Sequence, residues 1–152
     1  MPRRPDTAVR TALVTVELLV AGFAIWGGTQ MIAGTWDLPM DWLRHTPFDS
    51  WVVPGVALLA LPGLGVLAAA VAAASRLPGD RTLSLLAGAG LVAWIVVQVV
   101  WLRQLHPVMQ PTIAVAGLVV ALLASRLPAR RATAPGVTRR GRPPRARRAA
   151  PV

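Results

Sequence analysis

Residues 36–55 read WDLPMDWLRHTPFDSWVVPG, and this stretch divides the chain because it is the only long segment that is neither an apolar run nor an Arg-rich tail. It holds three of the six Trp, three of the six acidic residues and one of the two His. Indole rings favour the headgroup zone of a bilayer. The stretch therefore predicts a long extracytoplasmic loop at a membrane surface, with apolar spans on both sides of it.

Those apolar spans dominate the composition, since 55% of the 152 residues are hydrophobic and only 14% are charged. Runs of about 20 apolar residues match the hydrocarbon thickness of a bilayer. We expect an all-α membrane protein with one domain at residues 11–126. Its four transmembrane helices, in an up-down bundle held by helix packing in lipid, are expected at about residues 11–32, 47–75, 82–102 and 110–126.

The first span carries an acidic residue, Glu17. Residues 1–10 form a basic cytoplasmic leader. The run of about 22 apolar residues after it is longer than the apolar region of a signal peptide, which has about 7–15 residues. We therefore expect an uncleaved helix. Glu17 would lie about 9 Å along it from Thr11, a depth at which an ionisable group is costly and a functional candidate. In the structural alternative, Glu17 reaches toward the interface and pairs with Arg10 or Arg81.

The second span has a recognisable start and two internal prolines. Thr46-Pro47-Phe48-Asp49 places a capping residue, a first-turn Pro and an acid in order, which predicts a helix beginning at about Pro47. Pro54 and Pro62 then predict bends. Such bends can mark a transport path, but they also arise from packing, because neighbouring helices satisfy the freed backbone groups.

Two glutamines complete the polar groups of the spans: Gln30 in the first and Gln98 in the third. A lone Gln in a span usually bonds to a neighbouring helix, at about 0.6 kcal/mol. Two functions stay open. The first is a structural or accessory protein in a membrane complex, with a membrane-protein partner or as a homo-oligomer, because small-residue faces occur without a convergent polar site. The second is a small oligomeric transporter or channel that uses Glu17, Gln30 and Gln98.

The loops on the expected outer face supply a third, weaker hypothesis, a cation or enzyme site. Its candidate residues are Asp37, Asp41, His45, Asp49 and His106. Carboxylates suit hard cations, yet the Asp spacings of four and eight do not match an EF-hand loop. The chain has no Cys, which excludes disulfides, thiolate metal sites and dithiol chemistry. We find no catalytic constellation and expect no enzyme activity, metal or cofactor.

The distribution of Arg predicts the threading. All 16 basic residues are Arg, which together with abundant Ala, Gly and Pro indicates a GC-rich bacterial genome. With a cytoplasmic N-terminus, fourteen Arg lie inside and two, Arg44 and Arg103, lie outside. The positive-inside rule therefore predicts a multi-pass protein of the cell membrane with both termini cytoplasmic.

The last segment, residues 127–152, is rich in Arg and Pro and has no periodic apolar face. Like charges and low hydrophobicity predict a disordered cytoplasmic tail. Such a tail can bind anionic lipid, at about 1 kcal/mol per Arg near the surface. The alternative is a topological anchor with no ligand, and nucleic acid is not the expected partner.

A family resemblance rests on the loop. Leu38-Pro39-Met40-Asp41-Trp42-Leu43-Arg44-His45-Thr46-Pro47-Phe48, followed by Trp51 and Pro54-Gly55, resembles a segment of an uncharacterised family of small four-helix bacterial membrane proteins of actinobacterial type. Gln110-Pro111, before the fourth span, is similar too. The resemblance covers about residues 11–125. It implies the four-helix fold and the membrane location, and it carries no activity or functional residue.

Overall fold

The computed structural model describes residues 5–103 and 107–128, and within them every regular element is a helix. The elements are α1 (Pro5–Ala33), η1 (Met40–Leu43), α2 (Val52–Leu58), η2 (Leu59–Gly65), α3 (Val66–Ala74), α4 (Asp80–Leu102) and α5 (Met109–Ser125). The all-α prediction is confirmed for these residues. Predictions for residues 1–4, for His106 and for the tail at 129–152 lie outside them.

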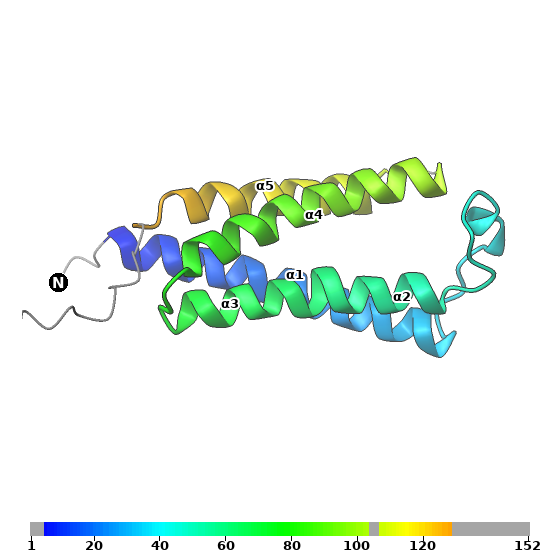
Figure 1. The fold of residues 1–152 in the computed structure, drawn as a ribbon, viewed down its shortest axis with the longest axis horizontal. Coiled ribbons are helices and arrows are strands. Elements are labelled where there is room, and N and C mark those ends of the chain that lie inside the picture. The colour runs from blue at the N-terminus through cyan, green and yellow to red at the C-terminus, as the bar shows by residue number, and fades with distance from the viewer. Residues whose placement is uncertain (1–4, 104–106, 129–152) are drawn as a thin grey trace, which may run out of the picture.

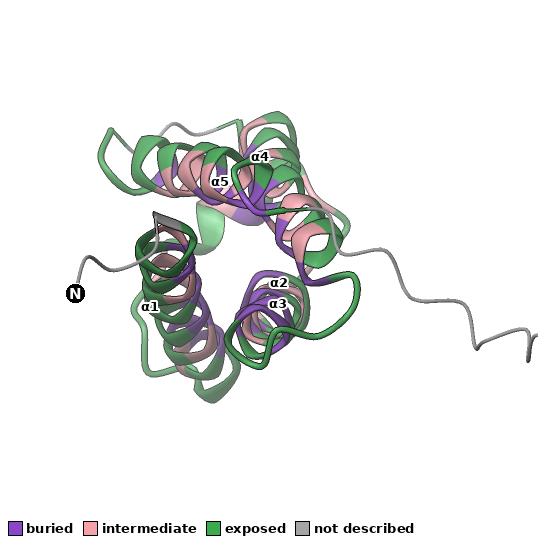
Figure 2. Ribbon diagram, turned by 90° about the vertical axis from the view of Figure 1, so that its left-hand side faces the viewer, coloured by how far each residue is buried: buried purple, intermediate pink, exposed green. Residues whose placement is uncertain are grey.

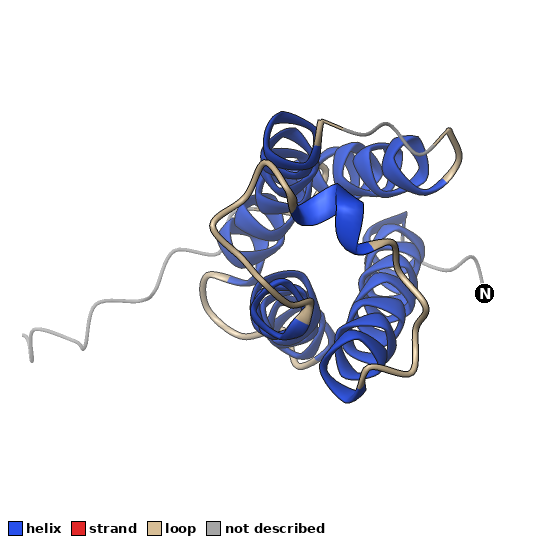
Figure 3. Cartoon of the chain, turned by 90° about the vertical axis from the view of Figure 1, so that its right-hand side faces the viewer, coloured by secondary structure: helices blue, strands red, loops and turns tan. Residues whose placement is uncertain are grey.

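The helices form two antiparallel hairpins that run along one long axis (Figure 1). In the first hairpin α1 packs against α2, η2 and α3, and in the second α4 packs against α5. We call the end where α1 begins and α5 finishes the terminal end. The opposite end, where η1 lies, is the loop end, and Figure 3 shows η1 crossing over it.

Three helical segments are long and apolar enough to cross a membrane: Asp6–Ala33, Val52–Ala74 and Asp80–Leu102. The helix α5 is apolar but shorter, with 17 residues. Large apolar side chains cover the outside of the bundle, and Phe23 for example is 72% exposed. Buried residues face the inside of the bundle instead (Figure 2). An apolar exterior of this kind indicates a membrane protein.

Two helix starts differ from the sequence pattern. The helix α1 begins at Pro5, before the apolar run, so Arg10 belongs to the helix. The helix α2 begins at Val52 and not at about Pro47, with no side-chain cap at its start. The Thr46 hydroxyl donates to the Leu43 carbonyl at 2.8 Å and accepts the Phe48 N–H at 3.3 Å. The Thr46 hydroxyl therefore stabilises the turn after η1 and does not cap the start of α2.

The two prolines of the second span have different effects. Pro54 lies in the first turn of α2, where N–H groups have no partner within a helix anyway. Pro62 lies inside η2, a π-helical segment of seven residues that joins α2 to α3. The wider turn absorbs the missing N–H and the bulk of the ring. The predicted irregularity therefore occurs at Pro62 alone.

Each hairpin is held close by a pair of glycines. A Cβ atom added to Gly28 would lie 2.8 Å from the Gly55 carbonyl oxygen, and one added to Gly88 would lie 2.7 Å from that of Gly117. Only glycine permits such an approach, and close backbone packing is a main source of helix association in lipid.

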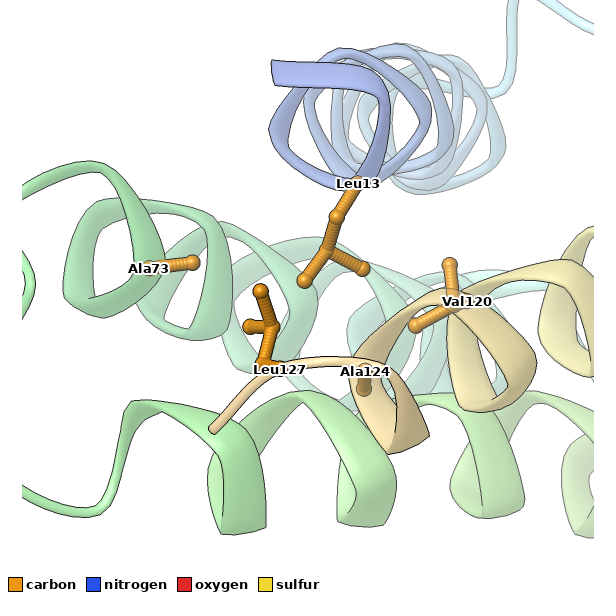
Figure 4. Packing of buried hydrophobic residues seen from close by; sticks show 5 residues of the cluster. All are labelled: Leu13, Ala73, Val120, Ala124 and Leu127. Atoms are coloured by element: carbon orange, nitrogen blue, oxygen red, sulfur yellow. The ribbon is translucent and has the colours of Figure 1, made fainter. Parts of the chain in front are cut away.

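The two hairpins are joined in the terminal half and in the middle of the bundle. One apolar cluster brings together side chains from both hairpins near the terminal end (Figure 4): Leu13, Ala73, Val120, Ala124 and Leu127. A second cluster in the middle consists of Ala21, Val66 and Leu91. In these regions α1 contacts α5, and α3 contacts α4. The loop half contains a cavity between the hairpins.

Candidate functional site

A buried ion pair connects three helices near the terminal end. The Arg10 guanidinium on α1 donates from Nη1 to Asp80 Oδ2 at 2.5 Å and to the Ala73 carbonyl at 2.6 Å. The two side chains are only 9% and 1% exposed. Because Ala73 lies in the last turn of α3 and Asp80 begins α4, this contact fixes the α3–α4 turn against α1.

The local sequence explains the position of Asp80. Gly79 adopts a left-handed backbone with φ of +85° and turns the chain into α4. Asp80 is then the first helical residue, where the helix dipole favours a negative charge. Its Oδ1 accepts the Arg81 N–H at 2.7 Å, so both carboxylate oxygens are bonded.

A second pair of buried polar residues lies one layer further into the bundle. Glu17 follows Arg10 by two turns of α1, and Ser84 follows Asp80 by one turn of α4. Both side chains are fully buried. They lie near each other, but no hydrogen bond of normal geometry reaches either carboxyl oxygen or the hydroxyl. The Glu17 carboxyl oxygens and the Ser84 hydroxyl therefore form a buried polar layer with no hydrogen-bond partner among the described residues.

The prediction that Glu17 pairs with Arg10 or Arg81 was wrong. Arg10 is bonded to Asp80, and among the described residues Arg81 forms no ion pair with Glu17. The reason is geometric: Asp80 at the start of α4 reaches Arg10 from the terminal end, while Glu17 points into the bundle two turns deeper. Sequence reasoning missed Asp80 as the partner because the contact joins residues 70 positions apart.

A cavity of about 110 Å³ lies at the loop end between the hairpins. One wall comes from α2 and the residue before it, and the other comes from the second half of α4. Its lining includes Trp51, Pro54, Ala57, Trp94, Gln98 and Trp101. Phe48 from the loop also lines it and packs edge-on against the Trp101 ring at 5.8 Å between centroids.

Three buried polar atoms belong to residues of this lining and have no hydrogen-bond partner among the described residues, although the cavity wall itself is almost entirely apolar. They are the indole Nε1 atoms of Trp51 and Trp94 and the Oε1 atom of Gln98. The expected bond from Gln98 oxygen to a neighbouring helix is therefore not formed. Buried polar atoms are usually satisfied in proteins, but these three have almost no accessible surface, so the cavity offers a ligand only its apolar wall.

The three residues proposed to line a transport path do not come together. Glu17 belongs to the terminal half and Gln98 to the loop-end cavity. Gln30 is half-buried near the end of α1 and is not part of the cavity lining. The layer of Ala21, Val66 and Leu91, each at most 2% exposed, lies between Glu17 and the cavity.

The acidic loop residues also remain apart. Asp37, Asp41, His45 and Asp49 are all exposed. A salt bridge at 3.4 Å joins Asp41 to Arg44 on the surface. In residues 5–103 and 107–128 no three acidic, His or Cys side chains gather as metal ligands would, and His106 lies outside these ranges.

Comparison with protein-family models, curated proteins and solved structures gives no match to this chain. The resemblance of the loop to a family of small bacterial membrane proteins therefore remains an expectation from its residues.

Proposed function

We propose that this chain is a four-span protein of the cell membrane, with both termini in the cytoplasm, that serves as an accessory subunit by binding a transmembrane helix of another protein. The distribution of Arg supports the orientation, since Arg76, Arg81 and Arg126 adjoin the terminal end and Arg44 and Arg103 adjoin the loop end. The helix α5, at about 25 Å, is close to the hydrocarbon thickness of about 30 Å and completes an even number of spans.

The closed interior favours an accessory role over transport by a single bundle. The Arg10–Asp80 pair joins helices at the terminal end, and the apolar layer at Leu91 separates Glu17 from the loop-end cavity. A solute path through one copy would have to cross both. The polar groups of this bundle are therefore better placed to fix helices than to conduct.

The observation that carries the proposal is the exposed face of α4. Ala89, Gly90 and Ala93 are exposed, although the same helix buries Gly88 against α5. A Cβ atom added to Gly90 would meet nothing within 4 Å. Small residues let another helix approach closely in lipid, and this face is left unused by the chain itself.

Substitution of Gly90 by Leu tests the proposal. The bundle itself has room for the larger side chain, but the Leu side chain would prevent a partner helix from approaching this face closely. Because the chain has no Cys, a single Cys at Ala93 can carry a photoreactive cross-linker in native membranes. We expect one reproducible protein partner, identified by mass spectrometry, and its loss in Gly90→Leu.

Gly22→Leu is the matched control. Gly22 also has open space around its Cβ position, but its exposed neighbours on α1, such as Leu19 and Phe23, are large. We expect this variant to keep the partner. A partner that survives Gly90→Leu, or cross-links to further copies of this chain alone, would overturn the proposal. Self-cross-links would favour the oligomeric transporter instead, with Glu17→Gln and flux in liposomes as its test.

A further inference from the structure

Glu17 is enclosed in the terminal half of the bundle. It belongs to the inward stripe of α1, with Leu13 one turn before it and Ala21 one turn after it, and all three side chains are at most 1% exposed. Leu13 is part of the apolar cluster near the terminal end (Figure 4), and Ala21 is part of the cluster in the middle of the bundle. The carboxyl group therefore lies between two apolar layers and has no surface in contact with water.

The hydrogen-bonding groups around Glu17 suit a neutral carboxylic acid. The Ser84 hydroxyl is the polar group beside it, and a hydroxyl offers one donor together with an acceptor oxygen. A protonated carboxyl also carries one donor, so a small rotation of either side chain lets one group donate to the other. A carboxylate has only acceptors, on two oxygens, and Ser84 can supply a single donor. The closed bundle therefore satisfies the acid better than the carboxylate.

No cation faces Glu17 to compensate a negative charge. Arg10, two turns away on α1, is bonded to Asp80 and to the Ala73 carbonyl, and among the described residues Arg81 on α4 forms no ion pair with Glu17. The other packed elements, α2, η2, α3 and α5, contain no acidic, basic or His residue. The Arg residues that follow α3 and α5 are exposed. An unpaired charge buried in this way is costly.

Ionisation of Glu17 therefore requires the bundle to open, and the terminal end is the shorter way in. Glu17 lies about 10 Å along α1 from Arg10 and about 24 Å from Ala33, the last residue of the helix. Only the apolar cluster at Leu13 separates it from the Arg10–Asp80 pair. If the start of α1 moves away from the α3–α4 turn, water reaches the carboxyl group from the terminal end.

We propose that Glu17 is a proton-sensitive switch that keeps the terminal half of the bundle closed while it is protonated and lets it open when the proton leaves. In that step the O–H bond of the acid breaks, the electron pair stays on the carboxylate, and water at the terminal end takes the proton. The switch goes beyond the accessory role, because it uses the interior of the bundle and not the face at Gly90. Since the terminal end is the one proposed to face the cytoplasm, the switch would respond to cytoplasmic pH.

The proposed switch opens as the pH rises. A Glu side chain in contact with water has a pKa of about 4.3, so near neutral pH the open form is ionised and the closed form is neutral. One proton is released on opening, and each pH unit therefore multiplies the ratio of open to closed molecules by up to about ten. The dependence ends at the pH at which the closed form itself loses the proton.

The reactivity of a buried thiol measures the opening. The chain has no Cys, so Ala73→Cys places a single thiol at a position that is 0% exposed. The full chain is reconstituted in vesicles and labelled with N-ethylmaleimide. Ala74→Cys, at the exposed neighbouring position, is the matched reference, because the ratio of the two labelling rates removes the effect of pH on the thiol itself. We expect this ratio to rise about tenfold or more between about pH 6 and about pH 8.

Neutral residues at position 17 should remove the pH dependence. Glu17→Gln keeps the shape of the side chain and Glu17→Met is apolar, so the test does not depend on one variant. In both backgrounds the labelling ratio should vary by less than about twofold over the same range, since no group there releases a proton on opening. A further substitution, Ala24→Cys, reports on a buried position of α1 beyond the middle cluster and should show no rise.

Each outcome decides for or against the switch. A rise in the ratio with pH that disappears in Glu17→Gln and Glu17→Met supports it. A ratio that stays flat with Glu17 present, or a rise that persists in either variant, overturns it. An equal rise at Ala24→Cys also overturns it, because the whole bundle would then come apart. Circular dichroism confirms that each variant is folded, and none of these results depends on a partner helix at Gly90.

Discussion

The buried ion pair allows a sharp test of the packing at the terminal end. In Asp80→Ala the Arg10 guanidinium would keep only the Ala73 carbonyl as a partner while remaining in a site where its side chain is 9% exposed. Removing one member of a buried pair typically costs about 3–5 kcal/mol, because the other charge is left uncompensated. Arg10 is close to the terminal end, where a long side chain can turn toward water. We therefore expect the lower part of that range, about 3 kcal/mol.

Replacing both members separates the value of the pair from the cost of breaking it. In Arg10→Met combined with Asp80→Leu no charge remains buried, and such replacements are often neutral or stabilising by about 1–4 kcal/mol. We expect the double variant to recover most of the stability that Asp80→Ala loses. Reversible unfolding in mixed micelles, followed by circular dichroism, measures all of the variants.

The surface pair Arg44–Asp41 is the matched control. Its atoms are 3.4 Å apart and its side chains are 62% and 69% exposed. Exposed pairs contribute about 0.2–1 kcal/mol, so Asp41→Asn should have a small effect. If Asp80→Ala costs no more than Asp41→Asn, or if the double variant is as unstable as Asp80→Ala, the reasoning is refuted.

Three further predictions concern the glycines of α4, Glu17 and the Arg-rich tail. Gly88→Ala should destabilise the protein by about 1–3 kcal/mol, because its Cβ would lie 2.7 Å from the Gly117 oxygen; Gly90→Ala, with open space around it, should stabilise by about 0.5–1 kcal/mol, and equal effects would contradict the α4–α5 packing. Glu17→Met should raise the unfolding free energy by about 1–3 kcal/mol, since it removes two buried oxygens without partners; a loss as large as that of Asp80→Ala would mean that Glu17 has a bonding partner. Deletion of residues 130–152 should lower affinity for vesicles with anionic lipid, as measured by flotation at low and high salt, and unchanged binding would dispose of the lipid role of the tail.

The candidate sites could be predicted only in part. Glu17 and Gln98 stand out in the sequence as polar residues in apolar runs, and the structure leaves both carboxyl oxygens of Glu17 and the Oε1 atom of Gln98 buried without a hydrogen-bond partner among the described residues. Ser84 and Trp51 were missed. Ser84 carries no signal by itself, since a Ser near a helix start is ordinary, and its significance comes from Glu17 on another helix. The preference of indole rings for the headgroup zone predicts the depth of Trp51 but not its neighbours.

The sequence by itself determined the all-helical class, the apolar spans and the separation of a polar loop from an Arg-rich tail. These features depend on hydropathy and on composition along the chain, which act locally. Tertiary structure alone decided that Arg10 binds Asp80, that Thr46 serves a turn and not a helix start, and that the hairpins leave a cavity beside Gln98. The Thr46 bonds are local, to Leu43 and Phe48, whereas the ion pair and the cavity depend on residues from different helices. Helix contacts in lipid are selected by close side-chain fit, which no periodicity in a single segment records.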